Sequence, residues 1–201
     1  MNIVWFDLET TGLSFTADEI IQVAAIATGP APKFKVREKI EIKIKPTEAG
    51  VGRLKRLVAS GFETVWDEQT WEKVWEREPG LQRLANFFKR HADIRTVSKR
   101  GRLYKTCRVA GHNISKFDIP MLFAHGKRYD IFMPVNPIAL DTFQMACAAK
   151  ILFRVGPDKL TIEGLCNYYH IEVGQLHDAL ADVMMNIEIA RELVKEFAEW
   201  E

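Results

Sequence analysis

Two carboxylates lie close together in an apolar segment near the start of the sequence. The stretch "NIVWFDLETTGL" places Asp7 and Glu9 two residues apart, after four consecutive apolar residues. In a β-strand, residues i and i+2 point to the same face, so these side chains would project side by side. Adjacent carboxylates repel each other and are costly to bury unpaired. Bound cations, nearby basic side chains or water at a strand end would compensate, and the apolar flanks make water the least favoured of these.

A second group of polar residues lies in "RVAGHNISKFDIPML". His112 and Asn113 follow an apolar, strand-like segment, and Phe117 and Asp118 open a predicted helix whose first turn accommodates Pro120. On this segment alone, a helix N-cap is the favoured interpretation of Asp118, because aspartate is common at that position.

A third group lies in "HDALADV", at the start of the last predicted helix. Asp178 is a natural N-cap for that helix, and Asp182 follows one turn later, at the edge of the apolar stripe. From that edge Asp182 can face a cleft, and His177 can reach the same cleft from the preceding loop.

The elements that must position these residues are predicted from hydrophobic periodicity. Strands are expected at 2–8, at 19–28, which is nearly all apolar, and at 33–45, which alternates strictly. Residues 47–92 have a helical pattern in two or three pieces, and two strand-like pieces surround a basic turn near 100. Helices and short strands then alternate to a last helix at about 178–199. The pattern predicts an α/β sheet with helices packed on it.

Length and composition are those of one globular domain. The 201 residues are 47% hydrophobic and 27% charged, which suffices for one core. We expect one domain over 1–201, with a helical and basic-turn elaboration at about 47–105. No apolar stretch approaches the roughly 20 residues that span a bilayer, and the start lacks a signal-peptide pattern. We therefore expect no membrane partner and a cytoplasmic location, with a nuclear one left open. Cys107, Cys147 and Cys166 are expected to be reduced core thiols.

Basic residues concentrate between residues 89 and 108, although the net charge is only +1. Eight cationic residues accompany the single acid Asp93 there: Lys89, Arg90, Arg95, Lys99, Arg100, Arg102, Lys105 and Arg108. A solvated loop and hairpin would explain them, and so would a rim that binds the backbone of a polyanion. Composition leaves both interpretations open.

Together the three groups resemble the motifs of the DEDD-type 3′–5′ exonucleases of the histidine subclass, the DnaQ-like family. "FDLETTGL" resembles the first motif, "HNISKFDIPML" the second and "HDALAD" the third, in the right order from residue 4 to about 190. The resemblance implies a ribonuclease H-like fold, a mixed sheet whose first three strands are antiparallel, flanked by helices.

The resemblance also assigns chemical roles. It implies that Asp7, Glu9, Asp118 and Asp182 hold two divalent cations, Mg²⁺ or Mn²⁺, and that His177 is the general base. Hard cations prefer carboxylate oxygens, and two of them would offset the repulsion between four acids. Two metals roughly 4 Å apart activate water and stabilise the leaving oxygen in phosphodiester hydrolysis.

Substrate contacts follow from the same resemblance. Gly12 permits a tight turn that brings backbone N–H groups near a ligand. The expected substrate-binding residues are Thr10, Thr11, Gly12, Leu13, His112, Asn113 and Phe117. Leu13 would press against the terminal base, although it also fits an ordinary exposed turn. His112 and Asn113 would contact substrate or satisfy the backbone at the strand end.

The sequence departs from the family in two places. Three residues separate His112–Asn113 from Phe117–Asp118, a spacing that resembles the animal repair exonucleases more than bacterial proofreading subunits. Residues 47–105 lack the family's short "hGIT"-like segment and carry "WDEQTWEKVW" instead. Asp67 would cap a helix there, with Trp71 and Trp75 one turn apart as core residues rather than base-stacking ones. Asp141, in "LDTF", is interpreted as a helix cap.

The function expected is release of nucleoside 5′-monophosphates from the 3′ ends of single-stranded DNA, in repair, proofreading or degradation. The alternative enzyme is an exoribonuclease that trims RNA 3′ ends or short oligoribonucleotides. A subunit that serves a polymerase or repair partner, or an inactive binder, is less favoured. The acids and His177 are intact, and the sequence ends at the last helix without a docking tail.

Overall fold

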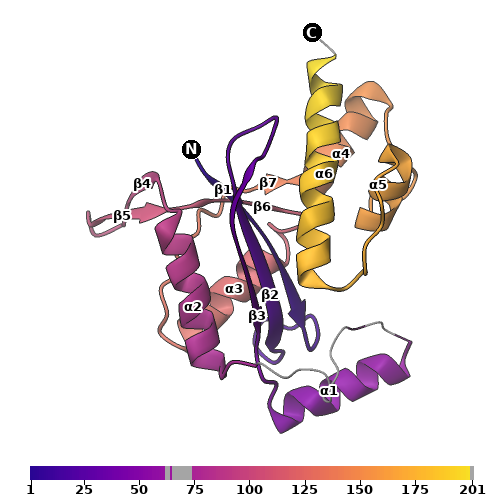
Figure 1. Ribbon diagram of the computed structural model, residues 1–201. Helices are drawn as coiled ribbons and strands as arrows, with labels where there is room; N and C mark the ends of the chain where they lie inside the picture. Colours follow the sequence, from indigo (N-terminus) through magenta and orange to yellow (C-terminus); the bar gives the residue numbers. More distant parts are fainter. Residues whose placement is uncertain (62–63, 65–73, 200–201) are drawn as a thin grey trace.

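The first strand, β1 (Ile3–Thr10), lies at the centre of a five-stranded sheet with the order β3-β2-β1-β6-β7 (Figure 1). The other strands are β2 (Ile20–Thr28), β3 (Val36–Lys43), β6 (Arg108–Gly111) and β7 (Leu140–Asp141). β1, β2 and β3 are antiparallel, whereas β6 runs parallel to β1 and β7 parallel to β6. This computed structural model describes residues 1–61, 64 and 74–199. It confirms the predicted mixed sheet.

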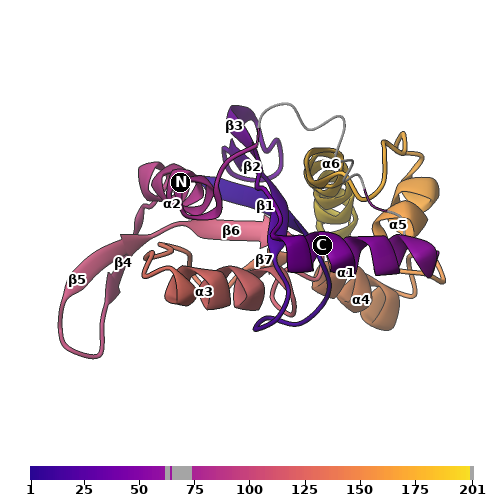
Figure 2. The same ribbon diagram turned by 90° about the horizontal axis from the view of Figure 1, so that it is seen from below.

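Helices cover both faces of this sheet. α2 (Arg77–Arg90) and α3 (Asp118–Arg128) lie on one face, and α6 (Ala179–Ala198) lies on the other (Figures 1 and 2). Every residue of β2 is buried, as its continuous apolar run predicts.

Residues of β1 alternate between the two helical layers. Phe6 and Leu8 pack with α2 and α3, whereas Ile3 and Trp5 pack with α6. The same alternation directs the side chains at positions 7 and 9 toward α6. The strand thereby brings two carboxylates to the layer that contains the third motif.

The remaining elements extend this core. α4 (Thr142–Ala148), the π-helical turn η1 (Ala149–Phe153) and α5 (Ile162–Tyr169) pack on the outer side of α6. α1 (Glu48–Ala59) follows β3, and β4 (Ile94–Val97) pairs with β5 (Leu103–Thr106) in a hairpin separate from the main sheet. In the part of the chain that the structure describes, each helix is too short or too polar to cross a membrane.

The prediction for the tryptophan segment is wrong at Trp75. Its backbone extends the sheet beside β3: the Trp75 N–H donates to the carbonyl of Lys43, at 2.8 Å, and the Lys45 N–H donates to Trp75, at 2.9 Å. The Trp75 side chain is 39% exposed, with the Arg83 guanidinium 5.1 Å from its ring, so it is no core residue. Asp67 and Trp71 lie outside the described residues. The three cysteines are free thiols; two are buried, and Cys147 is only partly so.

Candidate active site

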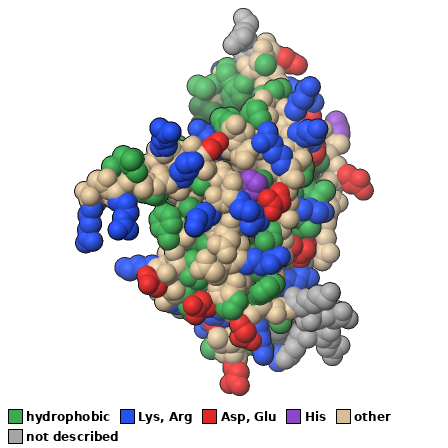
Figure 3. Space-filling model, turned by 60° about the vertical axis from the view of Figure 1, so that its left-hand side comes forward, with side chains coloured by type: hydrophobic (Ala, Val, Ile, Leu, Met, Phe, Trp, Pro, Cys, Tyr) green, Lys and Arg blue, Asp and Glu red, His purple; other side chains and the backbone are tan. Residues whose placement is uncertain are grey.

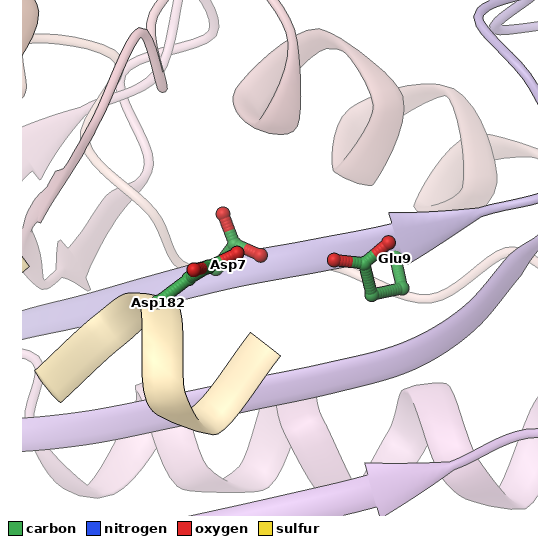
Figure 4. A group of neighbouring side chains, drawn as sticks. All are labelled: Asp7, Glu9 and Asp182. Carbon is green, nitrogen blue, oxygen red and sulfur yellow. The ribbon is translucent and has the colours of Figure 1, made fainter. Parts of the chain in front are cut away.

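Three of the four predicted carboxylates meet at one point beside β1. Asp7 and Glu9 project from β1, and Asp182 projects toward them from the first turn of α6 (Figure 4). One oxygen from each side chain lies within 4.8 Å of the others. Residues 173 positions apart in the sequence therefore form one group of acids.

Burial and mutual repulsion dominate the electrostatics of this acid group. Burial, and then the charges of Asp7, Asp182 and Asp178, raise the pKa of Glu9 to about 9. Burial is also the main cause that raises the pKa of Asp7, followed by the charge of Asp182. Burial and the charge of Asp178 raise the pKa of Asp182 to about 6. Without a cation, Asp7 and Glu9 therefore favour the protonated form at neutral pH, whereas Asp182 stays mostly ionised.

Asp118 lies beside this group but serves a different local role from the one its own segment suggests. Phe117 is the N-cap of α3, so the helix-cap interpretation of Asp118 is wrong. Its Oδ1 instead accepts a hydrogen bond from the Leu8 N–H, at 3.1 Å. β6 pairs with β1 only as far as Trp5, which leaves that edge of β1 open for a side chain. Burial, and then the charge of Asp7, raise the pKa of Asp118.

The donor set suits hard divalent cations. Carboxylate oxygens are the ligands that Mg²⁺ and Mn²⁺ prefer. Oδ1 of Asp182 is buried and has no hydrogen-bond partner among the described residues. An unpaired buried carboxylate oxygen is costly, and a cation would satisfy it.

The segment before α6 places His177 next to the acids. His177 has a left-handed backbone, with φ 60°, and its backbone hydrogen-bonds Asp182. Asp178 caps α6 as predicted: its Oδ1 accepts from the N–H groups of Leu180, at 3.1 Å, and Ala181, at 3.0 Å. The amide of Gln22, on β2, donates to Asp178 Oδ2 at 3.2 Å and so joins the helix start to the sheet. The sequence did not single out Gln22.

The turn after β1 is held by an acid that the sequence analysis also missed. Asp18 accepts hydrogen bonds from the Thr11 hydroxyl, at 3.1 Å, and from the Ser14 N–H, at 2.9 Å. Gly12 packs against the same carboxylate, because a Cβ at this position would lie 2.5 Å from Asp18 Oδ2. Leu13, at the tip, is 77% exposed. In the sequence, the position of Asp18 a few residues after Gly12 was the feature that could have indicated an acid bonded to this turn.

The second motif is organised by Asp141. Its carboxylate caps α4 at the Phe143 N–H, at 3.1 Å, as predicted, and also accepts from the backbone N–H groups of Asn113, at 2.9 Å, and Ser115, at 3.2 Å. The hydrogen bonds from Asn113 and Ser115 thus fix the loop that leads to Asp118. The sequence predicts the helix cap but not these two hydrogen bonds.

The side chains of the second motif face several neighbours. The His112 ring contacts the Thr142 hydroxyl, at 3.0 Å, and burial lowers its pKa. Phe117 packs against Phe15, with ring centroids 6.0 Å apart. Asn113 has a left-handed backbone, with φ 55°. His112 and Phe117 therefore have structural partners of their own.

Comparison with protein families gives one match. The model of a family described as exonuclease matches residues 4–78, which include the first motif. No curated protein sequence matches the chain.

Comparison with solved structures extends over nearly the whole chain. E. coli exonuclease I in complex with a dT13 oligonucleotide matches 98% of this chain and 43% of its own, with 20% identity and a TM-score of 0.71. Exonuclease I from Methylocaldum szegediense matches 97% of this chain and 40% of its own, with 22% identity and a TM-score of 0.69. A zinc-bound form of E. coli exonuclease I with single-stranded DNA also matches. The chain thus spans about two fifths of the length of these proteins.

Family model and fold therefore agree. The chain has the ribonuclease H-like fold of exonuclease I, and its resemblance to the exonuclease family is confirmed by the match over residues 4–78.

Proposed function

We propose that this chain is a metal-dependent 3′–5′ exonuclease that releases nucleoside 5′-monophosphates from single-stranded DNA. The observation that carries the proposal is the acid group of Asp7, Glu9 and Asp182, with ligand oxygens within 4.8 Å. The match to the exonuclease family supports it, as does the shared fold with a protein solved in complex with dT13.

The acids would act as ligands for two divalent cations, Mg²⁺ or Mn²⁺. Asp7, Glu9 and Asp182 would hold them together with Asp118, whose pKa is raised by burial and then by the charges of Asp7 and Glu9. Bound cations would lower the pKa of a water molecule and neutralise charge on the phosphate and on the leaving oxygen. The repulsion between the acids in the cation-free site is the physical reason for this assignment.

His177 would act as the general base. It directly precedes the cap of α6, and its backbone hydrogen-bonds Asp182, so the residue lies beside the acid group. Its imidazole would take a proton from the attacking water. The water oxygen would bond to phosphorus as the bond to the preceding nucleotide's 3′ oxygen breaks. That oxygen would gain a proton, leaving a shortened strand and a 5′-monophosphate.

The turn after β1 would hold the 3′ terminus. Backbone groups of Thr10, Thr11 and Gly12 would line the pocket, with Leu13 against the terminal base. Asp18 fixes the shape of this turn, and the exposed Leu13 side chain is available for an apolar contact. His112, Asn113 and Phe117 are proposed as further contacts. The single-domain organisation and a polymerase or repair partner also remain predictions.

The decisive experiment uses matched single-stranded DNA and RNA oligonucleotides with 5′ or 3′ labels. Reactions would contain Mg²⁺, Mn²⁺ or EDTA. Asp7→Asn would remove one proposed ligand charge, and Glu172→Gln would serve as the control for an exposed acid. We expect early release of labelled mononucleotide from the 3′ end and a shrinking 5′-labelled ladder.

Three outcomes are informative. Loss of both signals in EDTA and in Asp7→Asn, but not in Glu172→Gln, would support the proposal. Faster release from RNA would change the substrate to RNA and keep the mechanism. Intact DNA and RNA in every reaction would overturn the proposal and favour a binding subunit.

A further inference from the structure

A basic hairpin projects from the body of the molecule. Its two strands, β4 and β5, pair only with each other among the described strands, and the chain between them forms the exposed tip at 99–102. Figure 2 shows the hairpin reaching beyond the sheet and the helices, and Figure 3 shows basic side chains along this projecting arm. An arm of this kind presents its side chains to a partner rather than to the core.

The charge of the arm is uncompensated. Its five cationic side chains occur without any acid between residues 94 and 106: Arg95, Lys99, Arg100, Arg102 and Lys105. All five are exposed, and none forms an ion pair with another described residue. Their neighbours differ, because Arg90 pairs with Glu38, at 2.6 Å, and Arg108 pairs with Asp93, at 2.6 Å. The positive charge of the arm is therefore available to an anionic partner.

The two faces of the hairpin have different environments. Cross-strand pairing places Arg95 opposite Lys105 and Val97 opposite Leu103 on one face, where Val97 is 61% and Leu103 73% exposed. The other face carries Thr96 opposite Tyr104, and both side chains are partly buried. The exposed face thus combines cations with apolar surface.

A cleft of about 640 Å³ opens at the base of the hairpin. Its lining includes Lys89 of α2, Tyr104 and Lys105 of β5, and Phe132 of the loop after α3. The Phe132 ring is 63% exposed and meets the Tyr104 ring edge to face, with centroids 5.5 Å apart and planes at 81°. An exposed aromatic ring beside cations, here Phe132, is the combination that binds single-stranded nucleic acid, through base stacking and phosphate contacts.

We propose that the hairpin and this cleft form a second binding site for the single strand, away from the 3′ end. The proposal rests on the proposed function for the nature of its ligand. Exposed lysines on a hairpin can also prevent sheet-to-sheet pairing. That explanation does not account for an exposed phenylalanine inside a cleft that lysines flank.

The topology separates this site from the acid group. Ile3 pairs with Arg108, so the hairpin extends from the end of β1 opposite to Asp7. At about 3.3 Å per residue, four residues of β1 and about eight residues back to the tip span on the order of 30–40 Å. At a stacked rise of about 3.4 Å per nucleotide, that distance corresponds to about ten nucleotides. A five-nucleotide strand held at the acids in a stacked conformation would not reach the hairpin tip, whereas a 25-nucleotide strand would.

The test compares dT5 with dT25 in two assays. Fluorescence anisotropy in EDTA measures binding without cleavage, at several salt concentrations, and hydrolysis in Mg²⁺ measures kcat and KM. The test variant is Lys99→Gln/Arg100→Gln/Arg102→Gln. The control, Arg154→Gln/Lys159→Gln/Lys195→Gln, removes the same charge from exposed side chains on the α4–α6 side of the molecule.

For the hairpin variant we expect dT25 binding to weaken about tenfold or more, and the slope of log K against log salt to fall by about 2. KM for dT25 should rise, while hydrolysis of dT5 should match that of the wild type. The control variant should change neither quantity by a comparable amount. Phe132→Ala should weaken dT25 binding roughly tenfold through lost stacking, and Phe132→Trp should retain it.

The remaining outcomes separate the two proposals. If dT5 and dT25 are both hydrolysed, and the two triple variants weaken dT25 binding equally, the hairpin site is overturned and the exonuclease proposal is kept. Binding of dT25 that depends on the hairpin, without hydrolysis, would support the site and overturn the exonuclease. Sedimentation would detect a dimer. If only the hairpin variant dissociates such a dimer, and dT25 binding is unchanged, the arm is a protein interface and the proposal is overturned.

Discussion

Asp118 accepts the backbone N–H of Leu8, at 3.1 Å, and thereby joins the start of α3 to β1 between the two acids of the first motif. The contact occurs where β6 has ended and β1 has an unpaired edge. It gives the carboxylate two separable properties, a hydrogen-bond acceptor for the sheet and a negative charge beside Asp7. Variants can therefore distinguish structure from cation binding at one position.

Asp118→Asn should fold normally but lose much of its stabilisation by Mg²⁺. The amide oxygen can still accept from Leu8, and removal of the charge relieves repulsion with Asp7 and Glu9. In EDTA, its free energy of unfolding should equal or exceed that of the wild type. Denaturant unfolding with and without Mg²⁺ measures both quantities.

Asp118→Ala is the matched control. It leaves the Leu8 N–H unpaired and should cost about 1–3 kcal/mol even in EDTA. Full stabilisation by Mg²⁺ in Asp118→Asn would remove Asp118 from the proposed ligand set.

Without cations, the protein should become less stable as pH rises from about 5 to 9. Burial and neighbouring acids raise the pKa of Glu9 to about 9 in the folded state, from 4.5. Between these values the unfolded chain has released the proton and the folded chain retains it, so rising pH favours unfolding. The slope is at most about 1.4 kcal/mol per pH unit for each such carboxyl. Denaturant unfolding in EDTA across this range checks the direction.

Mg²⁺ should reduce that slope, because a nearby cation favours the charged carboxylates. Glu9→Gln should also reduce it, whereas Glu172→Gln, at an exposed position, should leave it unchanged. A stability that rises with pH in EDTA would contradict the raised pKa values.

His177 should matter more for turnover than for cation binding. His177→Asn is the suitable variant, because the backbone has φ 60° and asparagine tolerates the left-handed region better than alanine. Loss of a general base costs about 10²–10⁴-fold in kcat. Calorimetric titration with Mn²⁺ should give nearly unchanged affinity. An equal loss of affinity and turnover would assign His177 to the cation site instead.

Gly12→Ala should impair substrate use more than stability. The added Cβ would lie 2.5 Å from Asp18 Oδ2, so the turn proposed to hold the 3′ terminus must shift. A misplacement of about 1 Å can cost up to 100-fold in kcat/KM. Gly52→Ala is the control, since its Cβ would meet only the flexible end of Arg56, at 3.8 Å. Wild-type kinetics for Gly12→Ala would separate the turn from the substrate.

The sequence predicts the elements of this fold well where one physical signal dominates. The apolar run of β2 and the period-2 position of Asp7 and Glu9 on β1 both follow from side-chain alternation. The N-cap role of Asp178 follows equally directly from local capping chemistry.

Other features depend on contacts between distant segments and could not be predicted. Asp118 has the position of a helix cap in its own segment, and only the end of β6 reveals the open edge of β1 that it serves. Trp75 has a helical spacing from Trp71, but its backbone hydrogen bonds go to β3. Asp18, Gln22 and Asp141 act through partners far away in the sequence or around a turn, which periodicity does not encode.

Asp141→Ala should destabilise the protein and, through it, the site. The Asp141 carboxylate accepts three backbone N–H groups, those of Asn113, Ser115 and Phe143, so its removal leaves three donors unpaired. Such a loss should cost roughly 3 kcal/mol of the free energy of unfolding. Asp141→Asn retains an acceptor and should lie between alanine and the wild type. Denaturant unfolding measures stability, and kcat/KM is compared below the unfolding range. A loss of kcat in Asp141→Ala without any loss of stability would mean that this carboxylate takes part in the chemistry itself rather than in holding the loop that leads to Asp118.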